Sequence, residues 1–163
     1  MKLALLFLLL AGPALAAPHS ANVHADGIGD AVRLDGGGSY DAQSGQISLG
    51  GGYKVLKDIT AGPLGGLRQF DGTRWKATEI LADAPFKCAG ADAAKTVVTD
   101  DDTVVFLADF FRGGEGAVAF FHAKIFLSAN DEDPDQPGIQ NVWIQGVGCD
   151  EGASLAPAVA AMR

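Results

Sequence analysis

The sequence predicts an all-β protein, folded as a single-domain antiparallel β-barrel of about six to eight hairpin-connected strands, with a β-sandwich as the alternative. Three observations lead to this fold class. Apolar and polar residues alternate along several segments, turn-forming residues separate those segments, and helical periodicity is almost absent. The chain has 163 residues, 22 of them glycine. Residues 31–150 are expected to form the barrel.

Residues 1–16 have the three-part layout of a secretory signal peptide, with a basic start, an apolar run from Leu3 to Leu10 and a small-x-small site at Ala14–Ala16. We expect cleavage near Ala16 and a protein that is secreted or periplasmic. The apolar run is too short to cross a bilayer, which needs roughly 20 residues. No cysteine stands at the cleavage site, so the sequence predicts no membrane anchor.

The charge balance is acidic, with 12 basic and 20 acidic residues and a net charge of −8. A surplus of negative charge repels nucleic acid and anionic membranes alike. We therefore exclude nucleic acid as a partner.

The first hairpin is expected after a mobile lead-in at residues 17–30, which show little periodicity. Its strands cover residues 31–40 and 46–56. Asp41 opens the turn and Gly45 closes it, as in a type I turn that ends in a left-handed glycine.

The register of this hairpin is set by size, because each large residue can be placed opposite a small one. Gly38 then faces Ile47, Gly36 faces Leu49 and Leu34 faces Gly51. Glycines at such positions let strands bend and make room for bulky partners. A valine at Gly36 or Gly51 is expected to overpack the fold.

The third strand is expected over residues 73–82, with Trp75, Ala77 and Leu81 on one face. Residues 83–92 read as irregular, and residues 96–98 as a short pairing segment. A further hairpin follows, with strands over 103–111 and 117–128. The same size rule places Phe110 opposite Ala119, Ala108 opposite Phe121 and Phe106 opposite Ala123.

The opposite face of this second hairpin is too apolar to lie open to solvent. It carries Phe111, Phe120 and Phe126 beside Lys124, which are the candidate ligand-binding residues. A C-terminal helix, a second sheet, a bound apolar molecule or a partner subunit could cover it. The last strand is expected over residues 139–149, and residues 151–163 as a short helix or tail.

Cys88 and Cys149 are an even pair in a chain with an export signal, which indicates a disulfide. The closed loop would stabilise the fold by about 4 kcal/mol on the chain-entropy model. Free thiols, a redox site or a metal site are the alternatives, but neither cysteine has a CxxC neighbour or a nearby histidine.

Gly36–Asp41, Gly50–Gly52 and the stretch Gly72–Thr78 together resemble a family of small secreted bacterial proteins. Strands of that uncharacterised family carry GGGS(F/Y)D and GGG motifs and then a GTWKAT-like stretch. The likeness covers roughly residues 34–81, and Arg74 is an insertion relative to the family pattern. The resemblance implies a secreted all-β domain and carries over no site residues.

Asp131, Asp133 and Asp135 have the alternate spacing that begins a calcium loop. The match then fails, because Gln136 stands where an EF-hand needs glycine and Val142 where it needs glutamate. A simpler Ca²⁺ site at these carboxylates is one expectation, and a solvated acidic turn is the other.

His122 is expected to lie on the same sheet face as Asp109, as a diagonal neighbour about 7 Å away. Such a carboxylate could orient an imidazole as a general base. The alternative is a hydrogen-bonded pair on a half-exposed sheet, since the sequence contains no motif for a nucleophile, an oxyanion hole or a cofactor.

Three functions fit these features. The first is a secreted non-enzymatic β-domain that binds a small apolar ligand or a protein partner through its Phe-rich face. The second is a barrel-type enzyme, isomerase- or cyclase-like, that uses His122 and Asp109 in an apolar cavity. The third is a structural or assembly protein that pairs exposed strand edges.

Overall fold

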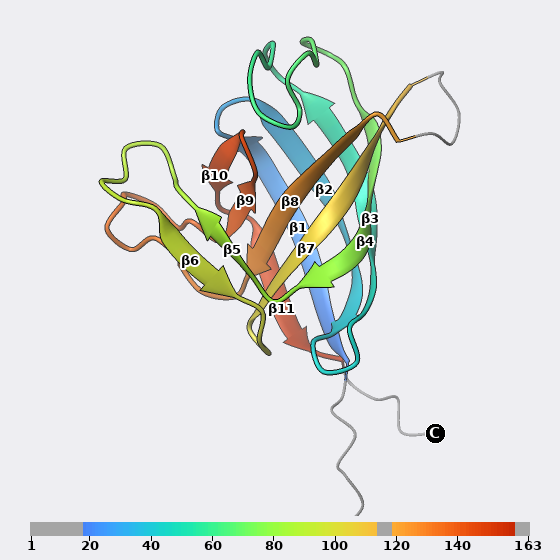
Figure 1. Cartoon of the computed structure of the whole chain (residues 1–163), viewed down its shortest axis with the longest axis vertical. Helices are drawn as coiled ribbons and strands as arrows, with labels where there is room; N and C mark the ends of the chain where they lie inside the picture. Colours follow the sequence, from blue (N-terminus) through green and yellow to red (C-terminus); the bar gives the residue numbers. More distant parts are fainter. Residues whose placement is uncertain (1–17, 114–118, 159–163) are drawn as a thin grey trace, which may run out of the picture.

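The computed structural model describes residues 18–113 and 119–158, which form eleven β-strands and no helix (Figure 1). The prediction of an all-β fold is confirmed. No helix in this described part is long and apolar enough to cross a membrane. The strands are β1 (His19–Ile28), β2 (Val32–Asp41), β3 (Gln46–Val55), β4 (Thr73–Leu81), β5 (Asp83–Phe86), β6 (Lys95–Val98), β7 (Thr103–Arg112), β8 (Phe121–Ser128), β9 (Val142–Ile144), β10 (Gly148–Asp150) and β11 (Ala153–Pro157).

Nine strands form one antiparallel sheet in the order β10-β9-β8-β7-β4-β3-β2-β1-β11, and β5 and β6 form a separate two-stranded sheet. The large sheet curls into a half-barrel, as Figure 1 shows. This curl is consistent with the predicted barrel or sandwich class, and it gives the sheet a concave inner face and a convex outer face.

The two edges of the large sheet meet at Gly152. This residue separates β10 from β11, which are consecutive in the chain but lie at opposite edges. The amide of His24 donates to the Gly152 carbonyl (2.9 Å). Gly152 has φ +127, and a Cβ there would lie 2.2 Å from the His24 oxygen, so only glycine fits.

Asn141 holds the same seam through its side chain. Its amide nitrogen donates to the Ala153 carbonyl (3.0 Å), and its amide oxygen accepts from the backbone of Gly152 (3.0 Å) and Ala153 (3.2 Å). One buried side chain therefore links the segment before β9 to the start of β11.

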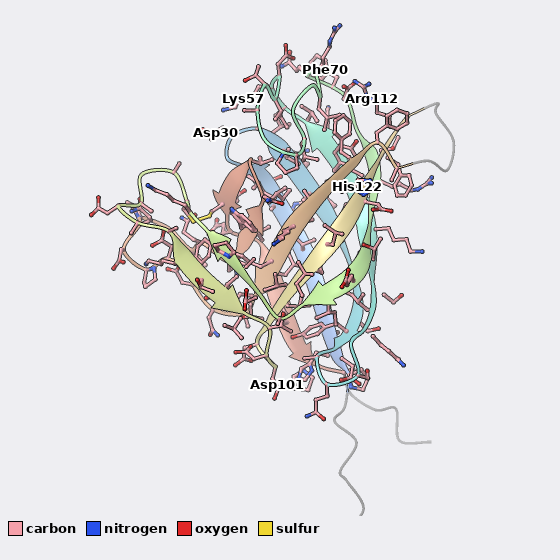
Figure 2. The ribbon with its side chains drawn as sticks, in the orientation of Figure 1. Asp30, Lys57, Phe70, Asp101, Arg112 and His122 are labelled. Carbon is pink, nitrogen blue, oxygen red and sulfur yellow. A yellow bond between two sulfur atoms is a disulfide. The ribbon has the colours of Figure 1, made fainter. Side chains whose placement is uncertain are left out.

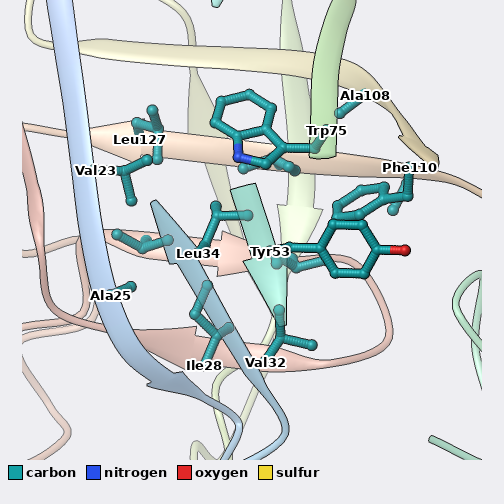
Figure 3. Close-up of a cluster of buried hydrophobic side chains, with 14 of the residues drawn as sticks. Val23, Ala25, Ile28, Val32, Leu34, Tyr53, Trp75, Ala108, Phe110 and Leu127 are labelled. Carbon is teal, nitrogen blue, oxygen red and sulfur yellow. The ribbon is translucent and has the colours of Figure 1, made fainter. Parts of the chain in front are cut away.

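The inner face is filled by large apolar side chains, several of them aromatic (Figure 3). Trp75 stacks on Phe106 at 5.8 Å between ring centroids, and Tyr53 meets Phe110 edge-on at 5.0 Å. The Trp75 indole donates to the Asp35 carbonyl (3.0 Å). Paired rings of this kind pack the core while their polar atoms keep hydrogen-bond partners.

The predicted register is wrong in both hairpins by two residues. Gly36 pairs with Gly51, and Leu34 pairs with Tyr53. In the second hairpin Ala108 pairs with Ala123, and Phe106 with Ile125. A shift of two residues keeps every side chain on its predicted face.

The turn explains the shift in the first hairpin. Asp41 belongs to β2, pairs with Gln46 and accepts the Gly45 amide on its carbonyl (2.9 Å). Its carboxylate accepts the amides of Gln43 (2.9 Å) and Ser44 (3.1 Å). This capping lowers the Asp41 pKa and places the whole turn after Asp41.

Size complementarity acts instead between neighbouring hairpins. Trp75 of β4 lies opposite Gly51 of β3, and a Cβ on Gly36 would come within 2.9 Å of the Trp75 ring. The glycines of the first hairpin thus make room for the indole of the next strand.

Two terminal segments were expected to lie outside the sheet, and both expectations are wrong. His19–Ile28, within the predicted lead-in, forms β1, and Ala153–Pro157, within the predicted tail, forms β11. They pair with each other, with Ala21 opposite Leu155. The inward side chains Ala21 and Ala25 are small, which explains their weak apolar signal. Residues 159–163 lie outside the described residues.

Strand boundaries and faces differ in two further places. β4 has a bulge between Ala77 and Glu79, so Leu81 lies on the outer face and not beside Trp75 as predicted. The strand expected over 139–149 is a hairpin, β9 and β10, closed by the Val147 amide on the Ile144 carbonyl (3.0 Å).

The sheet of β5 and β6 covers part of the outer face, where a second sheet was one of the expected covers. Phe86 of β5 meets Phe126 edge-on at 4.9 Å, and Phe126 stacks on Trp143 at 5.9 Å. The predicted disulfide between Cys88 and Cys149 is confirmed, with Cα atoms 5.2 Å apart. It joins the segment after β5 to β10 beside this second aromatic cluster.

The contact between Gly51 and its neighbours gives a test of the fold. A Cβ at Gly51 would lie 1.9 Å from the Asp35 carbonyl oxygen and 2.5 Å from the Gly36 Cα. We expect Gly51→Ala or Gly51→Val to destabilise the protein by roughly 2 kcal/mol or more, measured by thermal or denaturant unfolding. Gly52→Ala is the matched control, because its Cβ would meet its nearest atom at 3.5 Å. Equal losses in Gly51→Ala and Gly52→Ala would contradict this packing.

Candidate functional site

His122 and Asp109 lie directly opposite each other on β8 and β7, closer than the predicted diagonal. His122 Nδ1 is 2.7 Å from Asp109 Oδ1. The pair sits on the outer face, with the His122 side chain 58% exposed, and Lys76 is the cross-strand neighbour of Asp109 on β4. The imidazole is oriented by a carboxylate, on an open sheet surface.

The four candidate ligand-binding residues do not form one apolar cavity. Phe126 is buried under β5 and β6, and Phe111 is covered by the Arg74 guanidinium at 4.2 Å from its ring centroid. Lys124 lies further along β8, opposite Leu107. Phe120 alone among the three phenylalanines is exposed.

The acidic segment Asp131–Asp135 holds an ammonium group of the chain itself. Lys95 Nζ lies 2.6 Å from Asp133 Oδ1 and 2.7 Å from Asp135 Oδ2, and both carboxylates raise the Lys95 pKa. Asp131 accepts the amides of Asp133 and Gln140. Within residues 18–113 and 119–158, no group of three or more His, Cys, Asp or Glu side chains is arranged to hold a metal. Calcium binding stays a prediction, and this loop offers no ready ligand set.

A different cluster stands out at one end of the curled sheet, and we call it the aromatic rim. It consists of Phe70, Phe120 and Phe121 with Lys54 and Arg112. Figure 2 shows Phe70 and Arg112 together at this end. Phe70 is 72% exposed and Phe120 45%. Exposed aromatic side chains beside cations are typical of binding surfaces.

Phe70 is held in a backbone conformation that bulky residues rarely adopt. Its φ is +72°, within the left-handed region. The surrounding turn fixes it, because the Asp71 amide donates to the Arg68 carbonyl (2.9 Å) and the Phe70 amide donates to the Val55 carbonyl (2.9 Å). Glycine or asparagine usually occupies such a position, and a strained residue costs about 1–3 kcal/mol.

Cationic groups lie against the rings of the rim. Lys54 Nζ is 5.5 Å from the Phe70 ring centroid, and Arg112 Cζ is 6.0 Å from that of Phe121. Arg112 Nη2 also lies 2.7 Å from Asp71 Oδ2. A shallow pocket of about 320 Å³ opens here, lined by Phe70, Asp71, Gly72, Arg112 and Gly113.

Two pKa shifts describe the electrostatics of the rim. The Arg112 guanidinium, followed by the backbone amide of Arg68, holds the Asp71 pKa below its usual value. Burial raises the pKa of Tyr53 to about 12, and its hydroxyl donates to the Phe111 carbonyl (3.0 Å) at the base of the rim. Asp71 is therefore ionised and Tyr53 neutral at neutral pH.

Sequence reasoning found Phe120 but missed Phe70 and Arg112. A bulky aromatic residue directly before Asp71-Gly72 in a loop was the available signal, because such dipeptides mark turns. The left-handed backbone of Phe70 also depends on the hydrogen bond from its amide to the Val55 carbonyl on β3, which no local pattern encodes.

Comparison with known proteins adds no assignment, because no protein family model, curated protein or solved structure matches this chain significantly. The resemblance of its glycine motifs to a secreted bacterial family stays a prediction.

The Asp71 carboxylate gives a pH-dependent test of the rim. Its folded pKa is lowered, so the stability it contributes is present above its unfolded pKa of about 3.9 and is lost as pH falls through the folded value. We expect Asp71→Asn to reduce the free energy of unfolding at pH 7 by about 1 kcal/mol, since the pair is partly exposed. The acid limb of its stability curve should flatten below pH about 4. Asp92→Asn is the control, and a similar flattening there would contradict the assignment to Asp71.

Proposed function

We propose that this protein is an exported, non-enzymatic binding module that contacts a protein partner through the aromatic rim. The Cys88–Cys149 disulfide supports export, because such bonds persist in the periplasm and outside the cell. The signal-like layout of residues 1–16 points the same way.

The observation that carries this proposal is the strained and exposed Phe70. Folding alone gives no reason to place a large apolar ring in solvent at a position that suits glycine. Strain of this kind is typical of functional positions, where the gain appears on binding. Phenylalanine and arginine are also residue types that are enriched at protein interfaces.

A protein partner suits the rim better than a small apolar ligand. The space inside the curled sheet is occupied by Trp75, Tyr53, Phe106 and Phe110, all buried. The rim pocket is shallow and bordered by the Arg112–Asp71 ion pair. Shallow surfaces with aromatic anchors and a polar border are typical of protein interfaces.

A second candidate function rests on the 2.7 Å contact between His122 and Asp109. An imidazole oriented by a carboxylate can act as a general base, as an isomerase- or cyclase-like enzyme would need. The pair lies on an open face beside Lys76 and Lys124, and not in an apolar cavity. We therefore rank this function second.

Replacing Phe70 by glycine tests the binding proposal. Gly accommodates φ +72° without strain, so we expect Phe70→Gly to leave the free energy of unfolding within about 1 kcal/mol of wild type. Loss of an aromatic anchor should weaken partner binding by about 2 kcal/mol, roughly 30-fold in Kd. The partner would be captured from the exported fraction of the source organism, purified, and titrated by calorimetry.

Ile139→Ser is the matched control, because Ile139 is an exposed apolar residue outside the rim. It should leave the Kd unchanged. Equal affinity of the wild type and Phe70→Gly for the purified partner would rule out the rim as the contact surface.

His122→Ala separates the two candidate functions. For a binding module we expect a change in the free energy of unfolding within about 1 kcal/mol, since the His122 side chain is largely exposed, and no change in partner affinity. Mass spectrometry of small molecules incubated with the wild type and the variant would reveal turnover. A conversion that the wild type performs and a folded His122→Ala lacks would favour the enzyme.

A further inference from the structure

Charge is distributed unevenly between the two ends of the molecule. The stretch Tyr53–Lys76, which contains Lys54 and Phe70 of the rim, carries five basic and two acidic residues, although the whole chain has a net charge of −8. In Figure 2, Lys57, Phe70 and Arg112 lie at the end opposite Asp101. The rim therefore brings Lys54, Arg112 and exposed aromatic rings together at one end of an acidic protein.

The opposite end holds a groove, which we call the acidic groove. It has a volume of about 480 Å³ and lies between the β2–β3 turn and the ends of β4 and β6. Its apolar lining includes Ile80, Leu81 and Val98, and Val98 is 56% exposed. Five acidic residues and no basic ones occur within the adjoining segments 40–45, 80–86 and 96–104, namely Asp41, Asp83, Asp100, Asp101 and Asp102.

The groove exists because β4 leaves its neighbour. β3 and β4 pair only where Gly50–Gly52 lie opposite Arg74–Lys76, and the bulge in β4 follows at Thr78. Beyond it β4 curves away from the β2–β3 hairpin toward β5 (Figure 1). Ile80 and Leu81 therefore border open space beside the hairpin turn.

The acidic border of the groove is fixed in place. The Tyr40 hydroxyl donates to the Asp101 carbonyl (2.9 Å), and the Asp100 carboxylate accepts the Asp102 amide (2.9 Å). The Thr99 hydroxyl donates to the Leu81 carbonyl (2.6 Å). A preformed surface loses little conformational freedom on binding.

We propose that the aromatic rim of one copy docks into the acidic groove of a second copy. This inference rests on the proposed function and names the partner as a second copy of this chain. Phe70 would enter the lining formed by Leu81 and Val98. Lys54, which lies over the Phe70 ring, together with Arg68 and with Lys57 at the same end of the molecule, would face Asp100–Asp102.

Charge favours this orientation over the others. Two copies with a net charge of −8 repel each other in most orientations. Docking of rim to groove is the arrangement that brings the basic stretch onto the acidic border. The two surfaces differ and lie at opposite ends, so each docked copy keeps one unused rim or groove, and the assembly extends head to tail.

Sedimentation velocity of the purified mature protein tests the docking. We expect the average mass to rise with protein concentration and to fall as salt is added, because salt screens the rim and groove charges. A wild type that stays monomeric at every concentration and at low salt overturns the inference. In that case the proposed function is still decided by capture of a different partner on the rim.

Two variants identify the surfaces. Phe70→Gly removes the rim anchor, and Val98→Lys places a cation in the groove. Each alone should associate at least tenfold more weakly than the wild type. Thermal unfolding checks that both fold, and Asp101→Lys, whose side chain is 80% exposed, replaces Val98→Lys if that variant does not. Ile139→Ser should associate like the wild type.

A mixture of the two variants distinguishes rim-to-groove docking from rim-to-rim contact. Phe70→Gly keeps an intact groove and Val98→Lys keeps an intact rim, so an equal mixture should form dimers and nothing larger. A folded groove variant that dimerises alone as well as the wild type would mean rim-to-rim contact and overturn the inference. A mixture that stays monomeric while the wild type associates would overturn it too.

Discussion

The indole of Trp75 lies over Gly36 and opposite Gly51, and the curl of the large sheet depends on this contact. A side chain at either glycine would collide with backbone or with the ring. The indole bridges two hairpins, because its nitrogen donates to Asp35 on β2 while its strand pairs with β3 and β7. Strands β2, β3, β4 and β7 are thereby drawn around one buried ring, which fills the centre of the inner face.

The same sheet produces two ends of different character. At one end β3 and β7 finish and β4 begins near a turn that presents Phe70 among cations. At the other end the β4 bulge parts β4 from β3, and the acidic turns border the space between them. The groove follows from how far β4 stays paired with β3, whereas the rim depends on the turn around Phe70.

Sequence patterns predicted the fold class, the faces of most strands and the disulfide. The alternation of apolar and polar residues and the even number of cysteines do not depend on the exact register in which strands pair. They did not predict the register, which depends on Asp41 capping its turn from within β2. β1 and β11 were missed because alanines face inward there. His122 and Asp109 were placed on the correct face, and their separation was wrong by the same two-residue shift. Phe70 was missed because its conformation is imposed by hydrogen bonds from other segments.

The pairing of β1 with β11 delays completion of the sheet during folding. β1 is the first described strand and β11 the last, and they lie side by side in the sheet. Contacts between such distant segments form slowly, because a long loop must close first. The free edge of β1 stays open until Pro157 is available, so the sheet cannot be completed on a partly synthesised chain. The first and last described strands therefore complete the sheet together, as one late step of folding.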